Sequence, residues 1–422
     1  MATNVYGNGA NSTAGANTIV HYYDRAGIKA ANRMNVYGQF ADRKSMPTKM
    51  GKTFKISKFL HMYDRALADG DFASKGYLTA RSAADVSAAL TSATLSEGAG
   101  AVNKKSISKI TVEATLARYG EMIDYTDEVE LFSEDAMQVR YREELGELAN
   151  SRFEDLIQMD MLGTGTVIYS GVASAKKGVD TKISYDLVRK GVRKLVRNRA
   201  KKNTSIVTGS TKIGSTPIAK AFYGIIGADV KSDLESLVRG SGAETEYVYQ
   251  PAHKYAGAAS LAEGEVGAMH EVRFIEAESA VVYRGEGAPV TATGVSGEYT
   301  TDLTLQATTF ADHAAVAAVR TTVAYENDTT HAVTEEAADP GAGYTVLLTY
   351  IDVFPVLFPT EGAFATVGLK GKGKINFNSK SPAQVENSNP YGTTGFFSYN
   401  FFYAGLILEE EKLMKILVSA SV

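Results

Sequence analysis

The sequence predicts an α+β fold that is rich in strands and contains one long helix. Residues 54–57 and 110–117 alternate apolar with polar side chains, the pattern of a strand with one buried face. Residues 136–162 place apolar side chains every three or four positions instead, as an amphipathic helix does. Gly (39), Tyr (23) and Phe (17) are frequent and Pro (9) is scarce, which favours strands joined by many turns.

The bulk properties exclude several classes of protein. At 422 residues the chain predicts two or three domains. It has no cysteine, which excludes disulfides, thiolate catalysis and zinc–thiolate sites. A net charge of −4 argues against binding nucleic acid through the overall charge. Because there is no run of 18 apolar residues and no secretory signal at the start, we expect synthesis in a cytoplasm and no membrane span.

The first half of the chain begins with a polar arm, residues 1–20, rich in Asn, Gly, Ala and Thr, and residues 21–45 contain a short predicted helix. The two predicted strands follow, and the stretch between them, residues 60–105, is rich in Ala, Ser and Gly with few large apolar residues. Such a segment cannot bury much surface by itself. It predicts either a long hairpin whose distal part needs another molecule or a mobile surface loop.

The stretch "YGEMIDYTDEVELFSED", residues 119–135, contains seven carboxylates between Glu121 and Asp135. One interpretation is a strand end followed by the start of the long helix, where free N–H groups and the helix dipole favour Ser133 and the acidic side chains after it. The other is a magnesium site made of carboxylates alone, since no histidine pair accompanies them.

Residues 184–203, "SYDLVRKGVRKLVRNRAKKN", predict an amphipathic helix with a basic exposed face. No acidic residue occurs from Leu187 to Ala228. This face is expected to meet an anion or an acidic neighbour, or else to be simply solvated. Aromatic side chains are absent from it beyond Tyr185, which argues against sequence-specific reading of nucleic acid.

No cofactor is expected. "GSTKIGST", residues 209–216, has the glycine spacing of a phosphate loop, but Ser215 stands where the phosphate-binding lysine is required.

Residues 222–238 predict a strand, a turn and a helix capped by Asp229 or Ser232.

The last part of the chain changes character twice. Residues 281–345 are rich in Thr, Ala and Gly with short alternating runs, which predicts an inserted β module. The strands "TGFFSYNFFYAGLIL" and "KLMKILVSA" flank three glutamates, residues 409–411, and predict a closing hairpin.

The order of these segments resembles the major capsid fold of tailed phages, the Hong Kong 97-type fold. More narrowly, four segments resemble the coat-protein family named after coliphage N-four: "YGEMIDYTDEVEL", "GEVGAMHEVRFIEAESA", "YIDVFPVLFPTEGAFATVGL" and "GTTGFFSYNFFYAGLIL". The resemblance covers roughly residues 45–280 and 346–422. It departs at Glu271, where a small turn residue is expected, and residues 281–345 match no part of the family.

The resemblance implies a structural protein and not an enzyme. The chain would self-assemble as hexamers and pentamers into the icosahedral head shell of a tailed bacteriophage, enclosing double-stranded DNA without sequence preference. Shells would form in the cytoplasm of the bacterial host, with scaffold, portal and decoration proteins as candidate partners and with no cofactor or metal. The implied division of the chain is an N-terminal arm (1–45), an extension loop (46–118), a peripheral domain (119–182 and 376–422, with spine helix 136–162), an axial domain (183–280 and 346–375) and a β-rich insertion (281–345).

Two sets of candidate site residues follow. The first would lie at subunit interfaces, where cations of the extension loop meet the acidic run of an adjacent copy: Lys52, Lys55, Lys58, Arg65, Lys75, Arg81, Glu121, Asp127, Glu128 and Glu130. The second would face an anion or DNA: Arg189, Arg193, Arg197 and Lys201. Two other functions stay open from the residues alone, a metal-assisted hydrolase using the carboxylates of 121–135 and a β-rich adhesin built around 281–345.

Overall fold

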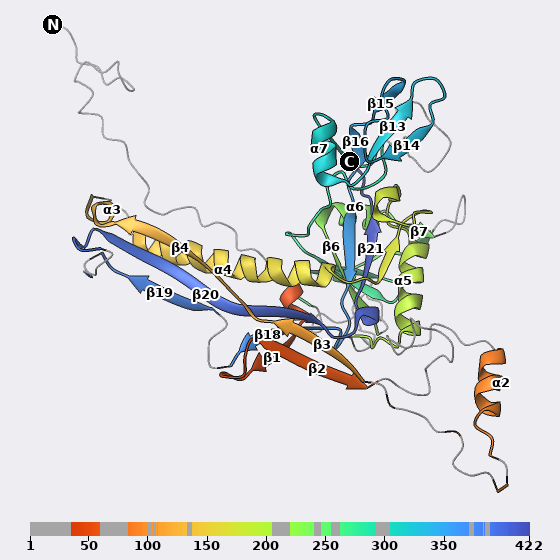
Figure 1. Ribbon diagram of the computed structural model, residues 1–422, viewed down its shortest axis with the longest axis horizontal. Helices are drawn as coiled ribbons and strands as arrows, with labels where there is room; N and C mark the ends of the chain where they lie inside the picture. The colour runs from red at the N-terminus through yellow and green to blue at the C-terminus, as the bar shows by residue number, and fades with distance from the viewer. Residues whose placement is uncertain are drawn as a thin grey trace.

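Two β-sheets meet at one long helix, α4 (Met137–Leu162), which runs along one sheet and ends against the other (Figure 1). The computed structural model describes residues 35–59, 83–95, 97–98, 103, 107, 109–132, 137–204, 220–239, 246–254, 262–291, 304–370, 375–382, 384 and 389–422. The prediction of a helix over 136–162 is confirmed; its 26 residues span about 39 Å at 1.5 Å per residue. None of the described helices is long and apolar enough to cross a membrane.

The first sheet forms the elongated part of the molecule, beside α4 (Figure 1). At its centre β20 pairs antiparallel with β4 over ten residue pairs, and also with β18 and β19. β1 completes the sheet by pairing parallel with β18. The five strands are β1 (Asp42–Met46), β4 (Ala117–Thr126), β18 (Phe364–Leu369), β19 (Asn376–Lys380) and β20 (Thr394–Ile407).

Aromatic side chains join this sheet to α4. Alternate residues of β20 are buried, and four of them in a row are aromatic: Phe397, Tyr399, Phe401 and Tyr403. Phe153 of α4 meets two of these rings edge-on, with centroids 5.6 Å from Phe401 and 5.5 Å from Tyr403. Strand alternation therefore supplies one continuous aromatic face, and the helix covers it.

The second sheet has seven strands in the order β5-β21-β17-β6-β11-β10-β9 and forms the body to which the elongated part is attached. Its inner strands are almost entirely buried, which explains their near-continuous apolar sequences. The bounds are β5 (Val167–Tyr169), β6 (Phe222–Ile226), β9 (Gln250–Pro251), β10 (Glu265–Met269), β11 (Val272–Glu276), β17 (Phe354–Phe358) and β21 (Met414–Val418).

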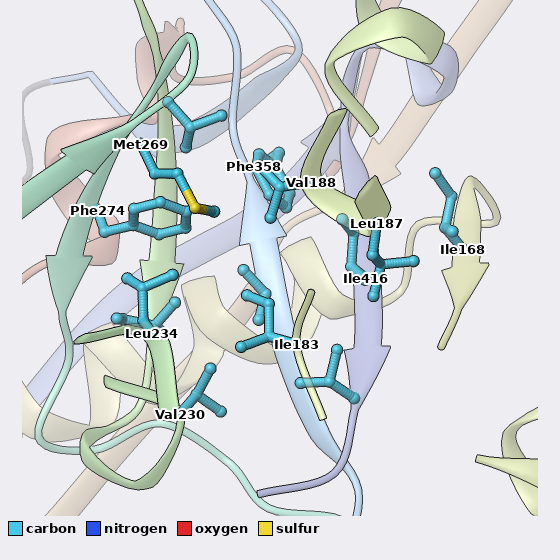
Figure 2. Packing of buried hydrophobic residues seen from close by; sticks show 14 of the residues in the cluster. Ile168, Ile183, Leu187, Val188, Val230, Leu234, Met269, Phe274, Phe358 and Ile416 are labelled. Carbon is cyan, nitrogen blue, oxygen red and sulfur yellow. The ribbon is translucent and has the colours of Figure 1, made fainter. Parts of the chain in front are cut away.

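Two helices, α5 (Tyr185–Arg197) and α6 (Ala228–Glu235), pack on one face of this sheet. Figure 2 shows Leu187 and Val188 of α5 with Ile416 and Phe358 of the sheet in one apolar cluster. Both helices were predicted from their sequence patterns, and both predictions are confirmed. The predicted cap of α6 is wrong, because its N-cap is Gly227 and no side chain caps it.

The predicted C-terminal hairpin is also wrong. β20 and β21 are neighbours in sequence but belong to different sheets, since β21 pairs with β17 and β5. The glutamates between them form a short 3₁₀ turn, Glu410–Lys412, that carries the chain from one sheet to the other. A buried strand has the same apolar sequence pattern whichever strand it pairs with, so the pattern cannot predict the pairing partner.

The predicted strands near the start of the chain pair with each other. β2 (Thr53–Phe59) and β3 (Lys109–Thr115) form an antiparallel ribbon of seven residue pairs. The intervening segment, residues 60–108, is described only in part. It contains α2 (Ala83–Thr91), which lies far from both sheets in Figure 1. Two apolar side chains there, Leu90 and Leu95, are exposed.

The segment predicted to be a β insertion contains strands and one short helix. β13 lies between β14 and β15, and β12 pairs with β16, while Asp312 caps α7 by accepting from the Ala315 N–H at 2.8 Å. These elements enclose a small apolar cluster of their own around Tyr325 and Tyr350. The bounds are β12 (Ala307–Thr309), α7 (His313–Val319), β13 (Val323–Asn327), β14 (Val333–Glu336), β15 (Tyr344–Val346) and β16 (Thr349–Ile351).

Candidate functional site

The acidic run begins on β4, where Glu121 is engaged within its own chain. Tyr399 donates its hydroxyl to Glu121 Oε2 at 3.0 Å, and Arg152 Nε of α4 lies 3.3 Å from Oε1. Burial, together with the hydrogen bond to Glu121 and its charge, raises the pKa of Tyr399 to about 12. Glu121 therefore joins β4, β20 and α4, although it was predicted to face an adjacent copy.

The middle of the acidic run is a separate short helix, where a strand end followed directly by the long helix was predicted. β4 ends at Thr126, and α3 (Asp127–Phe132) follows at once. Asp127 accepts from the Glu128 N–H at 3.0 Å and donates its own N–H to Thr393 O at 3.0 Å. Glu128 is exposed, and Glu130 lies on the same short helix. Among the predicted acidic interface residues whose side chains the structure describes, Glu128 is the one left to face another molecule.

The cations predicted to meet this run lie on and beyond β2. Lys55 pairs across the ribbon with Glu113 at 2.6 Å, and both side chains are more than half exposed. Lys52 precedes the strand and is exposed, and Lys58 lies near its end. Arg65, Lys75 and Arg81 lie outside the described residues.

Sequence reasoning missed an exposed apolar surface at the far end of the first sheet. Leu131 and Phe132 of α3 are 73% and 84% exposed, and Tyr391, in the turn before β20, is 88% exposed. We call these three residues the distal tip. The turn is held by Asn389, which accepts from Thr393 N–H at 3.0 Å and donates to Thr394 O at 2.8 Å.

A signal for the distal tip was present in the segment "ELFSED". Leu131 and Phe132 stand side by side among charged residues, so one short helix could not bury both of them on one face. Adjacent, exposed apolar side chains such as Leu131 and Phe132 of α3 form a surface suited to contact with another protein.

The predicted basic face is present on α5. The helix buries Leu187, Val188, Val192 and Leu195 against the seven-stranded sheet. Arg189, Arg193, Arg197 and Lys201 are all exposed. Arg189 lies 3.3 Å from Asp186, one turn earlier on the same helix. The three arginines thus share the solvent-facing side of α5, whereas Lys201 is exposed in the segment that follows the end of the helix at Arg197.

The described residues contain no group of three or more His, Cys, Asp or Glu side chains placed to hold a metal ion. Two carboxylates of the acidic run already have structural partners, Glu121 with Arg152 and Asp127 with the start of α3. The near-match to a phosphate loop, residues 209–216, lies outside the described part of the chain.

Comparisons with known proteins agree with this architecture. No protein-family model matches the sequence. The chain is similar to the major capsid protein of Pseudomonas phage KPP21, with 26% identity over 420 residues that cover 96% of this chain and 93% of that protein. The capsid of Ralstonia phage GP4 matches the structure with a TM-score of 0.54 at 10% identity, over 99% of each chain. The capsid of cyanophage Pam1 gives a TM-score of 0.49 at 10% identity, over 98% of this chain and 99% of that chain.

The Ralstonia phage structure establishes the fold, which is the tailed-phage capsid fold predicted from the sequence.

Proposed function

We propose that the chain is the major capsid protein of a tailed bacteriophage, which self-assembles into the head shell. The observation that carries the proposal is the likeness to a major capsid protein over 96% of this chain, together with the matching fold. Nothing in the comparisons supports a hydrolase or an adhesin. We therefore assign a structural role and no enzymatic one.

Features of the single chain support self-association. The distal tip exposes three large apolar side chains, and α2 lies apart from both sheets. The ribbon β2–β3 packs on the first sheet through Phe54 and Ala114, and a two-stranded ribbon is marginally stable without further packing along its length. In a closed shell each copy both offers such surfaces and covers those of its neighbours, so weak contacts repeat many times.

The finer division of the chain is part of this proposal. Residues 46–118 would be the extension loop, and 119–182 with 376–422 the peripheral domain. The axial domain would be 183–280 with 346–375, and 281–345 the insertion. Sheet membership favours three revisions: β5 and β21 are grouped with the axial strands, and β18 is grouped with the strands of the first sheet. Membership of the coat-protein family named after coliphage N-four rests on the four sequence segments that resemble it.

The partners are likewise proposed. The chain would associate with itself as hexamers and pentamers and enclose double-stranded DNA in a virion assembled in a bacterial cytoplasm. Scaffold, portal and decoration proteins are candidate partners that such a shell would use.

Charge reversal on α3 tests the predicted contact between copies. The double variant Glu128→Lys and Glu130→Lys should fold normally but assemble poorly, because Glu128 is exposed and the two introduced positive charges would repel the cations of an adjacent extension loop. Light scattering would follow assembly, and circular dichroism would report the fold.

A matched control reverses two other exposed glutamates, Glu278→Lys and Glu361→Lys, with the same change in net charge. If both double variants assemble at the wild-type rate, the contact through α3 is wrong. If both fail equally, the effect is one of overall charge and the contact is again not supported.

A further inference from the structure

We infer that the exposed basic side of α5 binds the phosphate backbone of double-stranded nucleic acid without reading its sequence. We define the basic row as Arg189, Arg193 and Arg197 of α5 together with Lys201, which follows the end of the helix. The inference deepens the proposed function, on which it rests, by naming the surface through which the chain would meet the polymer that its shell encloses.

The first support for this inference is the spacing of the arginines along α5. Its three arginines follow one another at four-residue spacing, so they lie on one side of the helix about 6 Å apart. From Arg189 to Arg197 the row covers about 12 Å along the axis. Each strand of a duplex presents a phosphate about every 3.4 Å of axis, so the row can face several phosphates at once.

The second support is that α5, which holds the arginines, is firmly packed and capped. The opposite side of α5 is fully packed, with Val188 and Leu195 inaccessible to solvent. Ser184 caps the N-terminus by accepting from the Leu187 N–H at 3.2 Å. The positive charges are therefore displayed by a fixed element, which lowers the entropy lost on binding.

The third support is that few carboxylates lie near the positive charges of the basic row. Among the described residues, Arg193, Arg197 and Lys201 have no carboxylate within ion-pair distance, and Arg189 has only the exposed Asp186 on its own helix. Like charges four residues apart on a helix repel one another. A row that is unfavourable for the isolated helix becomes favourable when a polyanion neutralises it.

Duplex nucleic acid fits the row better than an acidic surface of a second copy. A line of like charges calls for a partner with regularly spaced negative charge, which a duplex provides. In the described part of the chain, α4 interleaves its acidic residues with Arg142 and Arg152, and the short helix α3 carries only Asp127, Glu128 and Glu130. Glu121 is already paired with Arg152, and Glu271 with Lys202 at 2.9 Å.

The test compares two triple variants of the full chain, each lowering the net charge by the same amount. The first is Arg193→Gln, Arg197→Gln and Lys201→Gln. The control is Lys254→Gln, Arg284→Gln and Lys370→Gln, which removes exposed cations from other elements. Binding of the unassembled chain to a short DNA duplex of mixed sequence is measured over a range of salt concentrations, and shell formation is followed separately.

We expect the first variant to bind the duplex at least about tenfold more weakly at low salt. The slope of log affinity against log salt should fall in magnitude by about 2 to 3, because each lost phosphate contact removes about 0.9. The control should keep the wild-type slope, and a second duplex of different base composition should bind equally well. Should the triple variant fold poorly, Arg193→Gln alone should lower the slope by about 0.9.

Equal slopes for the basic-row variant and the wild type would overturn the inference. Loss of shells by that variant with unchanged duplex binding would also overturn it, because the row would then contact a second copy, and the proposed function would stand. If the wild-type chain forms no shells but the variant loses duplex binding, the proposed function fails while the binding surface is supported.

Discussion

At the scale of single residues, buried tyrosines carry a pH-dependent share of the stability. Tyr399 is buried and bonded to Glu121, and Tyr403 is buried and donates to Asp160 Oδ2 at 2.7 Å. Burial, followed by the nearby carboxylate, raises the pKa of both hydroxyls. Both groups are therefore held in their neutral, donating form by the fold.

The pKa of Tyr399 predicts how stability changes at high pH. An unfolded tyrosine loses its proton near pH 10, whereas in the fold the pKa of Tyr399 is about 12. The unfolded state thus binds fewer protons between these values, and the free energy of unfolding should fall as pH rises through this window. The contribution of Tyr399 is at most about 1.4 kcal/mol per pH unit.

Urea unfolding of the unassembled chain, repeated from neutral pH to pH 12, measures this dependence. Tyr399→Phe should lower the steepness of the fall, and Tyr391→Phe, whose ring is exposed, should leave it unchanged. A Tyr399→Phe profile parallel to that of the wild type would show that this hydroxyl is not the titrating group.

The same residues mark a limit of sequence reasoning. The sequence indicated that the acidic run precedes a helix, but it could not show that Glu121 pairs with Arg152 and Tyr399, which lie far apart along the chain. Charge patterns along a sequence give local neighbours, whereas these contacts arise from packing between elements. Glu121 is for that reason a weaker candidate for an interface than Glu128.

At the scale of elements, local patterns were sufficient wherever a periodicity was long. The helix α4, the helix α5 and the ribbon strands β2 and β3 were all predicted from their apolar spacing, and the structure confirms them. Sheet membership was not predictable: the two closing strands enter different sheets, although each has the sequence of a buried strand. The start of α3 was missed because a helix of six residues carries little periodic signal.

The N-cap of α5 gives a direct test of the account of this helix. Ser184→Ala should lower the free energy of unfolding by about 1 kcal/mol, since the Leu187 N–H loses its side-chain acceptor. Ser232→Ala, inside α6, is the matched control and should be neutral or slightly stabilising, because Ser232 caps nothing and alanine favours helix. Thermal unfolding of the unassembled chain measures both. A loss from Ser232→Ala equal to that from Ser184→Ala would contradict the role of the cap.

At the scale of the whole molecule, the two sheets of one chain are well packed while its extremities are not. The buried clusters lie on both faces of the seven-stranded sheet and between α4 and β20. The large exposed apolar side chains include those of the distal tip and of the segment around α2. The order of segments in the sequence predicted the fold, but the distal tip became visible only when α3 and the turn at Tyr391 were seen together.

The distal tip should contribute to assembly and not to folding. Phe132→Ser should leave the free energy of unfolding within about 0.5 kcal/mol of the wild type, because the side chain is exposed in the single chain. It should raise the protein concentration needed for assembly by about tenfold or more, if burial of one phenyl ring contributes more than about 1.4 kcal/mol. Val172→Ser, at a side chain that is 92% exposed, is the matched control. Equal assembly by Phe132→Ser, Val172→Ser and the wild type would exclude the tip from the contacts between copies.

The central claim is that sister copies cover the surfaces that one chain leaves open. Electron microscopy of the purified full chain under conditions that favour association tests it most directly. We expect closed shells built of fivefold and sixfold clusters. A population of single chains that stays monodisperse as concentration rises, with the segment around α2 packed on its own body, would contradict it.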